Sequence, residues 1–189
     1  MRRNNLSAWL GSGVWNAAAF LWGVAEGTLF FIVPDVLLSA AGLKRGARAG
    51  AVASVCAALG AALGGSLMYL WSVRDPASAL GAVLAVPAVS QAMVSEAALA
   101  MAGPNWFPAT LAGPLSFTPY KVYAILAPQA GANLAAFAAA SVLARLPRFV
   151  LISFGASFLR ARFGDRVSLA WLAGAWMLFY AVFFALTPG

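Results

Sequence analysis

The sequence contains no histidine and a single cysteine, Cys56. Histidine is the most common metal ligand and the most common general base near neutral pH. Its absence argues against most metalloenzymes, and we expect no metal, no cofactor and no catalytic residues. A lone cysteine offers neither a disulfide framework nor a redox pair. We interpret Cys56, in the apolar stretch AVASVCAALG, as a packing residue.

Charge is also scarce, because only 9% of the 189 residues are charged whereas 63% are hydrophobic. Soluble domains have about half apolar residues, so this composition indicates an integral membrane protein. The net charge of +7 would suggest a nucleic-acid partner in a soluble protein. Here the basic residues form no long run, and membrane topology accounts for them. We expect no nucleic-acid partner.

Four segments are predicted to cross the membrane as helices. A spanning helix needs about 20 apolar residues, a length that residues 49–72, 131–159 and 167–187 provide. Residues 8–25 follow a basic start and are predicted as a retained first helix, because no clear signal-peptide cleavage site follows them. Residues 76–103 are less apolar, and we interpret them as an interfacial helix, with a full membrane span as the alternative.

The apolar residues 26–43 contain Glu26, Pro34 and Asp35, and residues 24–42 read VAEGTLFFIVPDVLLSAAG. A carboxylate at bilayer depth costs several kcal/mol, so such residues are rare and usually functional. Proline interrupts a helix, and a broken backbone within a membrane needs protein or water around it. We predict a re-entrant hairpin broken at Pro34. Its two acids could carry protons, or they could face water at the membrane edge.

The second broken stretch, residues 104–130, contains five prolines, including Pro119, with Lys121 near its middle. It is predicted to form another re-entrant hairpin. Lys121 would provide a charge opposite to those of the first hairpin, or its amine would snorkel to an interface flanked by Tyr120 and Tyr123. Two hairpins entering from opposite sides form an inverted repeat, an arrangement of transporters whose binding site lies at the midplane.

The basic residues favour one orientation of the chain, with a cytoplasmic N-terminus and an external C-terminus. Arg145 and Arg148 are three residues apart and project from the same side of a helix. They could anchor the cytoplasmic face, or face inward, where a guanidinium suits a phosphate or an acidic partner. The groups assigned to the cytoplasmic face are Arg2 and Arg3; Lys44, Arg45 and Arg48; Arg145 and Arg148; and Arg160, Arg162 and Arg166.

Four motifs in order resemble the DedA (VTT-domain, SNARE-associated) membrane proteins, most closely their YqaA-like branch, over residues 20–165. They are the Glu26 and Asp35 pair around a proline, GAALGGSLMYLWS, FTPYKVYAILAPQAG and ASVLARLPRFVLISFGA. The chain departs from the family in its Asp35, where glutamate is common, and in Lys121, where arginine is usual. The expected architecture is a single all-α membrane domain, residues 1–189, with about four transmembrane helices and two opposed re-entrant hairpins.

The resemblance implies a transporter, not an enzyme, in the bacterial inner membrane: a flippase or scramblase that moves undecaprenyl phosphate or a phospholipid. Lys121, Arg145 and Arg148 would bind the lipid phosphate, and Glu26 and Asp35 would couple transport to protons. Membrane lipids would be the partners, and self-association stays open. The alternative is a proton-coupled transporter of a small soluble anion or metabolite. A lipid phosphatase is disfavoured without histidine, and a purely structural protein would tolerate alanine at these positions.

Overall fold

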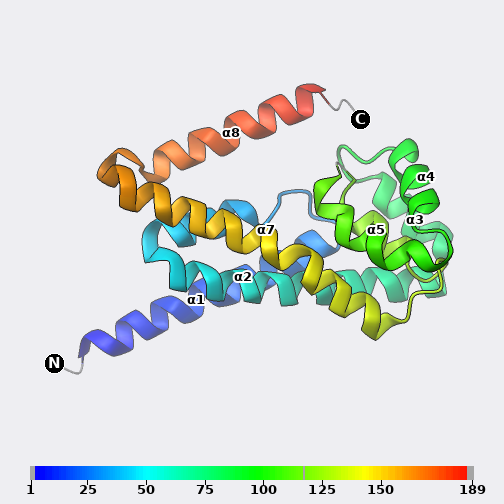
Figure 1. Cartoon of the computed structure of the whole chain (residues 1–189), viewed down its shortest axis with the longest axis horizontal. Coiled ribbons are helices and arrows are strands. Elements are labelled where there is room, and N and C mark those ends of the chain that lie inside the picture. The colour runs from blue at the N-terminus through cyan, green and yellow to red at the C-terminus, as the bar shows by residue number, and fades with distance from the viewer. Residues whose placement is uncertain (1–2, 117, 187–189) are drawn as a thin grey trace.

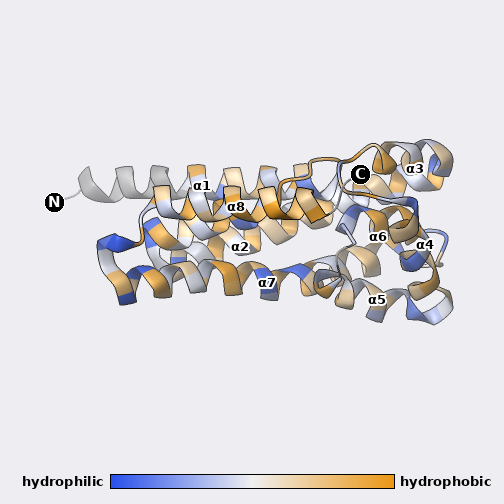
Figure 2. Cartoon of the chain, turned by 90° about the horizontal axis from the view of Figure 1, so that it is seen from above, coloured by the Kyte–Doolittle hydropathy of each residue, from blue (hydrophilic) through white to orange (hydrophobic). Residues whose placement is uncertain are grey.

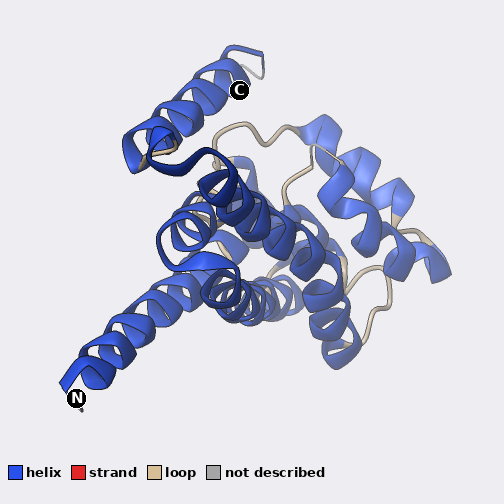
Figure 3. Ribbon diagram, turned by 60° about the vertical axis from the view of Figure 1, so that its left-hand side comes forward, coloured by secondary structure: helices blue, strands red, loops and turns tan. Residues whose placement is uncertain are grey.

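The computed structural model describes residues 3–116 and 118–186, with residues 3–12 described as backbone only. Every regular element in this part of the chain is helical, and no strand occurs in it (Figure 3). The predicted all-α class is therefore confirmed. The elements are α1 (Arg3–Gly27), α2 (Asp35–Arg74), α3 (Pro76–Leu84), α4 (Gln91–Ala100), η1 (Gly103–Asn105), α5 (Trp106–Ala112), η2 (Gly113–Leu115), α6 (Tyr120–Leu126), α7 (Leu134–Phe163), η3 (Gly164–Arg166) and α8 (Leu169–Leu186).

Three of the described helical segments are long and apolar enough to cross a membrane: α2, α7 with η3, and α8. They contain most of the predicted spans 49–72, 131–159 and 167–187, although residue 187 lies outside the described residues. Helix α7 begins three residues later than predicted, because the Asn133 side chain accepts hydrogen bonds from the first turn and caps it. The predicted first span, residues 8–25, lies within α1.

The chain reverses direction twice near its start (Figure 1). Helix α1 ends at Gly27, residues 28–34 form an irregular loop, and α2 begins at Asp35. Within α2 the backbone leaves helical geometry at Gly46, whose φ of 82° and ψ of 175° favour glycine. Residues 35–45 thus form a short helix that folds back beside the long remainder of α2, and the predicted stretch 26–43 is indeed broken at Pro34.

Helices α1 and α2 touch backbone to backbone. A Cβ atom added at Gly60 would lie 2.0 Å from the carbonyl oxygen of Phe20, and one added at Gly64 would lie 2.4 Å from that of Val24. The two glycines are four residues apart and therefore share one face of the helix, as in small-xxx-small packing motifs of membrane helices. The glycines of GAALGGS thus bring α1 against α2.

The segment between α2 and α7 folds into a cluster of short helices at the opposite end of the molecule from the N-terminus (Figure 1). The prediction that residues 76–103 form one helix is wrong, because the structure has two helices there, α3 and α4, separated at residues 85–90. Pro87 interrupts the helical hydrogen bonds there, Ala88 has a positive φ of 63°, and Ser90 caps α4 by accepting from the Met93 amide.

The basic residues gather mainly at one end. The N-terminus, the kink at Gly46 and the turn between α7 and α8 lie at the same end of the molecule (Figures 1 and 2). Two predicted groups, residues 44–48 and 160–166, follow this arrangement, whereas Arg2 lies outside the described residues. Arg145 and Arg148 do not belong to this end, because they occupy the middle of α7. Their grouping with the anchoring bases is therefore corrected.

Replacing Gly60 by alanine tests the α1–α2 contact. The added methyl group meets a backbone carbonyl that cannot move aside easily, so we expect a loss of about 1–3 kcal/mol of stability, as overpacking typically costs. The matched control is Gly155→Ala in α7, where an added Cβ meets nothing within 4 Å. Thermal unfolding in detergent measures both variants. Equal melting temperatures for the two would contradict the contact.

Candidate functional site

A cavity of about 340 Å³ lies between the loops of the two broken segments and α8. Its walls come from the end of α1, the 28–34 loop, residues 113–116 and 118–121, the middle of α7 and one face of α8. Glu26, Lys121, Arg145 and Arg148 all line it. Residues far apart in the sequence therefore bring charged side chains to one cavity.

Glu26 and Arg145 form a buried ion pair between α1 and α7. The Glu26 carboxylate, 5% exposed, accepts a hydrogen bond from Nη2 of Arg145. The Arg145 guanidinium also lies over the ring of Tyr120, with its Cζ 4.5 Å from the ring centre, and it is 5.3 Å from that of Phe149. Its Nε and Nη1 have no hydrogen-bond partner, so the pair leaves donor capacity unused within the site.

Asp35 and Arg148 form a second ion pair, one helical turn further along α7. Asp35 is fully buried, whereas the Arg148 side chain is 41% exposed. Asp35 is also the first residue of α2, where the positive end of the helix dipole favours a carboxylate. Its Oδ1 has no hydrogen-bond partner. The three-residue spacing of the arginines thus matches two acids that flank the 28–34 loop.

Lys121 joins the two broken segments directly. Its side chain is 2% exposed, and its Nζ donates a 2.7 Å hydrogen bond to the carbonyl oxygen of Phe30 in the 28–34 loop. The described residues contain no ion pair to Lys121. A neutral carbonyl cannot offset the cost of burying an ammonium group, so an anion in the cavity would stabilise the charged form of Lys121.

The 28–34 loop is held by side chains from three helices. Trp22 of α1 donates to the carbonyl of Ile32 over 2.9 Å, and Tyr180 of α8 accepts from the amide of Val33 over 2.9 Å. Lys121 of α6 provides the third bond. Irregular backbone in an apolar surrounding needs such partners, because each unsatisfied polar group costs several kcal/mol. These bonds explain how a non-helical loop persists inside the molecule.

The charges of the site do not balance. Three basic side chains, Lys121, Arg145 and Arg148, face two carboxyl groups, Glu26 and Asp35, so a single positive charge is in excess when all are ionised. Buried charges need partners because desolvation is expensive. An anion in the cavity would supply the missing negative charge and could accept from the unpaired nitrogens of Arg145. The arrangement is therefore suited to binding an anion.

All five charged residues singled out in the sequence meet at this site. Burial of Lys121 excludes a snorkelling side chain, and burial of Glu26 and Asp35 excludes a position at a water-exposed edge. Asp35 reaches the site through Arg148 and does not itself line the cavity. The expected breaks also coincide with helix starts, since Pro34 precedes α2 and Pro119 precedes α6.

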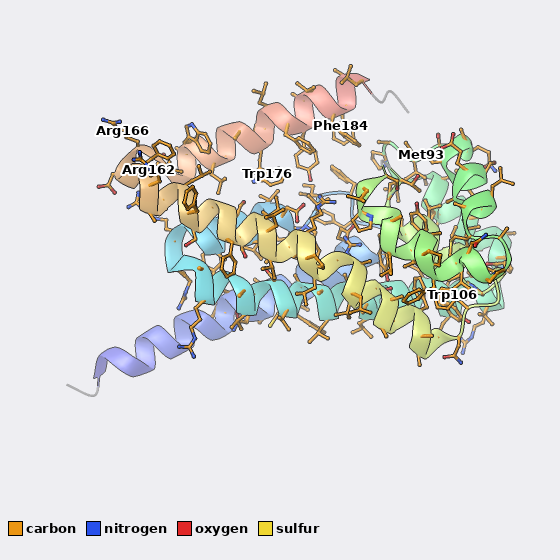
Figure 4. The ribbon with its side chains drawn as sticks, viewed as in Figure 1. Met93, Trp106, Arg162, Arg166, Trp176 and Phe184 are labelled. Carbon is orange, nitrogen blue, oxygen red and sulfur yellow. The ribbon has the colours of Figure 1, made fainter. Side chains whose placement is uncertain are left out.

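Sequence reasoning missed the aromatic residues that support the site. Tyr120 is not an interfacial anchor, because its hydroxyl donates to Ser141 over 2.6 Å and its ring lies beneath Arg145. In α8, Trp176, Tyr180 and Phe184 recur every four residues and point toward the body of the molecule (Figure 4 labels Trp176 and Phe184). That spacing was a usable signal of an inward aromatic face.

The fold and site define an all-helical protein with three potential membrane spans and a buried cluster of ionisable groups. Among the described residues no group of three or more His, Cys, Asp or Glu side chains could hold a metal ion. Compared with protein-family models, with curated proteins and with solved structures, the chain gives no match in any of the three.

The Glu26–Arg145 pair predicts an asymmetric double-mutant cycle. Glu26→Gln leaves a guanidinium that cannot lose its proton, so we expect a loss of about 3–5 kcal/mol, as for other broken buried pairs. Arg145→Gln should cost less, because the remaining carboxyl can take up a proton. The double variant should recover part of the loss. Unfolding in detergent measures all three, and additive effects would contradict a coupled pair.

Proposed function

We propose that this protein is a DedA-type membrane transporter, a proton-coupled flippase or scramblase that moves an anionic lipid such as undecaprenyl phosphate or a phospholipid across the bacterial inner membrane. The observation that carries the proposal is the buried cavity with excess positive charge and unused donors on Arg145. A phosphate supplies both the missing charge and the acceptors. The sequence resemblance points to the same substrate class.

The proposal includes two re-entrant hairpins. The first comprises the end of α1, the 28–34 loop and residues 35–45, and the second comprises α5, residues 113–116 and 118–119, and α6. The tips of both border the same cavity, although their flanking helices approach from opposite ends of the molecule (Figure 1). This arrangement supports an inverted repeat with a central binding site. The basic end would face the cytoplasm with the N-terminus, and the C-terminus would lie outside.

Protons would control access to the cations. When ionised, Glu26 and Asp35 occupy the facing nitrogens of Arg145 and Arg148. Uptake of a proton by a carboxyl removes its negative charge and frees the paired guanidinium for a phosphate. Lys121 would add a third positive contact while it holds the 28–34 loop. Proton binding and anion binding would thus favour each other, as coupled transport requires.

The walls of the cavity support a lipid over a small soluble anion. One side carries the charged groups, whereas α8 contributes Phe179, Tyr180, Phe183 and Phe184. No described residue of α8 is buried, so only this single helix separates the cavity from the surroundings on that side. A soluble anion would need a polar route, whereas a lipid can keep its chains in oil beside an aromatic wall.

Reconstitution into liposomes tests the function. Purified protein is expected to move labelled undecaprenyl phosphate or labelled phosphatidylglycerol between leaflets faster in the presence of a pH gradient. The double variant Glu26→Gln, Asp35→Asn should abolish this movement because neither position can take up a proton. Circular dichroism and size-exclusion chromatography check that the double variant remains folded. If it does not fold, the single variant Asp35→Asn is used for the same transport test.

Glu96→Gln is a matched control, because it neutralises an exposed acid of α4 that does not line the cavity. It should transport at the wild-type rate. Normal transport by a folded double variant would refute the proton role. Movement of labelled succinate into wild-type liposomes without movement of either lipid would favour the soluble-anion alternative.

A further inference from the structure

Helix α8 is the most weakly held wall of the cavity. It has no buried residue among those described, whereas α2 and α7 both contribute to the core. In Figures 1 and 3 it stands away from the other helices along most of its length.

Three contacts of α8, two hydrogen bonds and one aromatic contact, reach the segment around the 28–34 loop. Tyr180 accepts from the amide of Val33 over 2.9 Å. One turn earlier, Trp176 donates to the hydroxyl of Ser39 over 3.0 Å. One turn later, Phe184 meets Phe31 edge to face, with ring centres 5.8 Å apart. These contacts lie on one line along α8, so they would break or form together.

The base of α8 is fixed more firmly. The turn between α7 and α8 passes through Gly164, whose φ is +60°. The Arg160 side chain donates to the carbonyl oxygens of Gly164 and Val167 over 3.0 and 3.2 Å. These bonds pin the corner on both sides of the turn. Movement of α8 is therefore expected as a swing about this corner.

Little free energy opposes such a swing in a bilayer. Lipid chains are as apolar as the side chains they replace, so membrane helices are held by packing and hydrogen bonds with no hydrophobic driving force between them. Moving α8 outward exchanges its aromatic contacts for lipid contacts. The motion also breaks the bonds at Val33 and Ser39, each of which has a modest net value.

We propose that α8 is a lateral gate: it swings away from the 28–34 loop so that the hydrocarbon chain of an anionic amphiphile passes between α8 and the loop while its head group stays among the cations. This inference rests on the proposed function for its ligand. The aromatic face of α8, with Phe179, Phe183 and Phe184, forms the apolar half of the cavity. The Tyr180–Val33 hydrogen bond is the latch, and it joins the gate to the loop that Lys121 also holds.

Loss of the latch should expose the cavity more often. In a Cys56→Ala background, which has no other cysteine, Ala144→Cys places a thiol in the cavity lining. Tyr180→Phe should speed its labelling by N-ethylmaleimide about two- to tenfold, the effect of one net hydrogen bond on the opening equilibrium. The control is Tyr69→Phe, which loses a 2.7 Å bond to Ala132 elsewhere. Equal labelling rates in the two variants would overturn the latch.

Fixing the gate shut should stop transport. Ser39→Cys with Trp176→Cys, again without Cys56, replaces the hydrogen-bonded pair outside the cavity lining. A short bis-methanethiosulfonate should cross-link the two thiols. The cross-link should lower movement of the two labelled lipids at least about tenfold, equivalent to about 1.4 kcal/mol. Reduction of the cross-link should restore the movement. The single-cysteine variants with the same reagent are the controls.

Unchanged lipid movement in the fully cross-linked protein would overturn the gate while leaving the transporter intact. If the wild-type protein moves neither lipid, the proposed function fails. The gate is then decided by the labelling experiment, which requires no transport. The two failures are therefore distinguishable.

Discussion

The pairing of Arg145 and Arg148 with Glu26 and Asp35 is the interaction on which the centre of the molecule depends. Glu26 lies in the last turn of α1 and Asp35 begins α2, and both arginines lie on one side of α7. The two pairs therefore fix both ends of the 28–34 loop to a single helix. A loop without regular hydrogen bonding can persist in an apolar interior only when it is anchored in this way. The cavity owes its shape to that anchoring.

The same residues that stabilise the loop also give the site its chemistry. Arginine holds its charge throughout the accessible pH range, whereas a carboxylate can be neutralised. The pairs are therefore stable in one protonation state and weakened in the other. Lys121 adds a bond between the two broken segments that does not depend on either acid. In the proposed transporter, protons that control anion binding would also weaken the hold on the 28–34 loop, because the same two ion pairs serve both purposes.

Much of this arrangement could be predicted from the sequence. Charges in apolar segments are expensive unless they meet, so Glu26, Asp35, Lys121 and the arginines were expected to gather, and prolines mark where helices must start. The partner of each acid could not be predicted, because it depends on how α1 and α2 approach α7. The split of residues 76–103 and the aromatic face of α8 were missed, since both follow from tertiary packing.

The backbone contact between α1 and α2 has a consequence for how this molecule can move. Where side chains separate two helices, they can slide by changing rotamers, and this produces shear motion. At Gly60 and Gly64 no side chains intervene, so sliding there would drive carbonyl groups into the opposing backbone. The α1–α2 pair is therefore expected to stay rigid, and the alternation between inward and outward forms that the proposed transport requires would have to be carried by the elements that surround it.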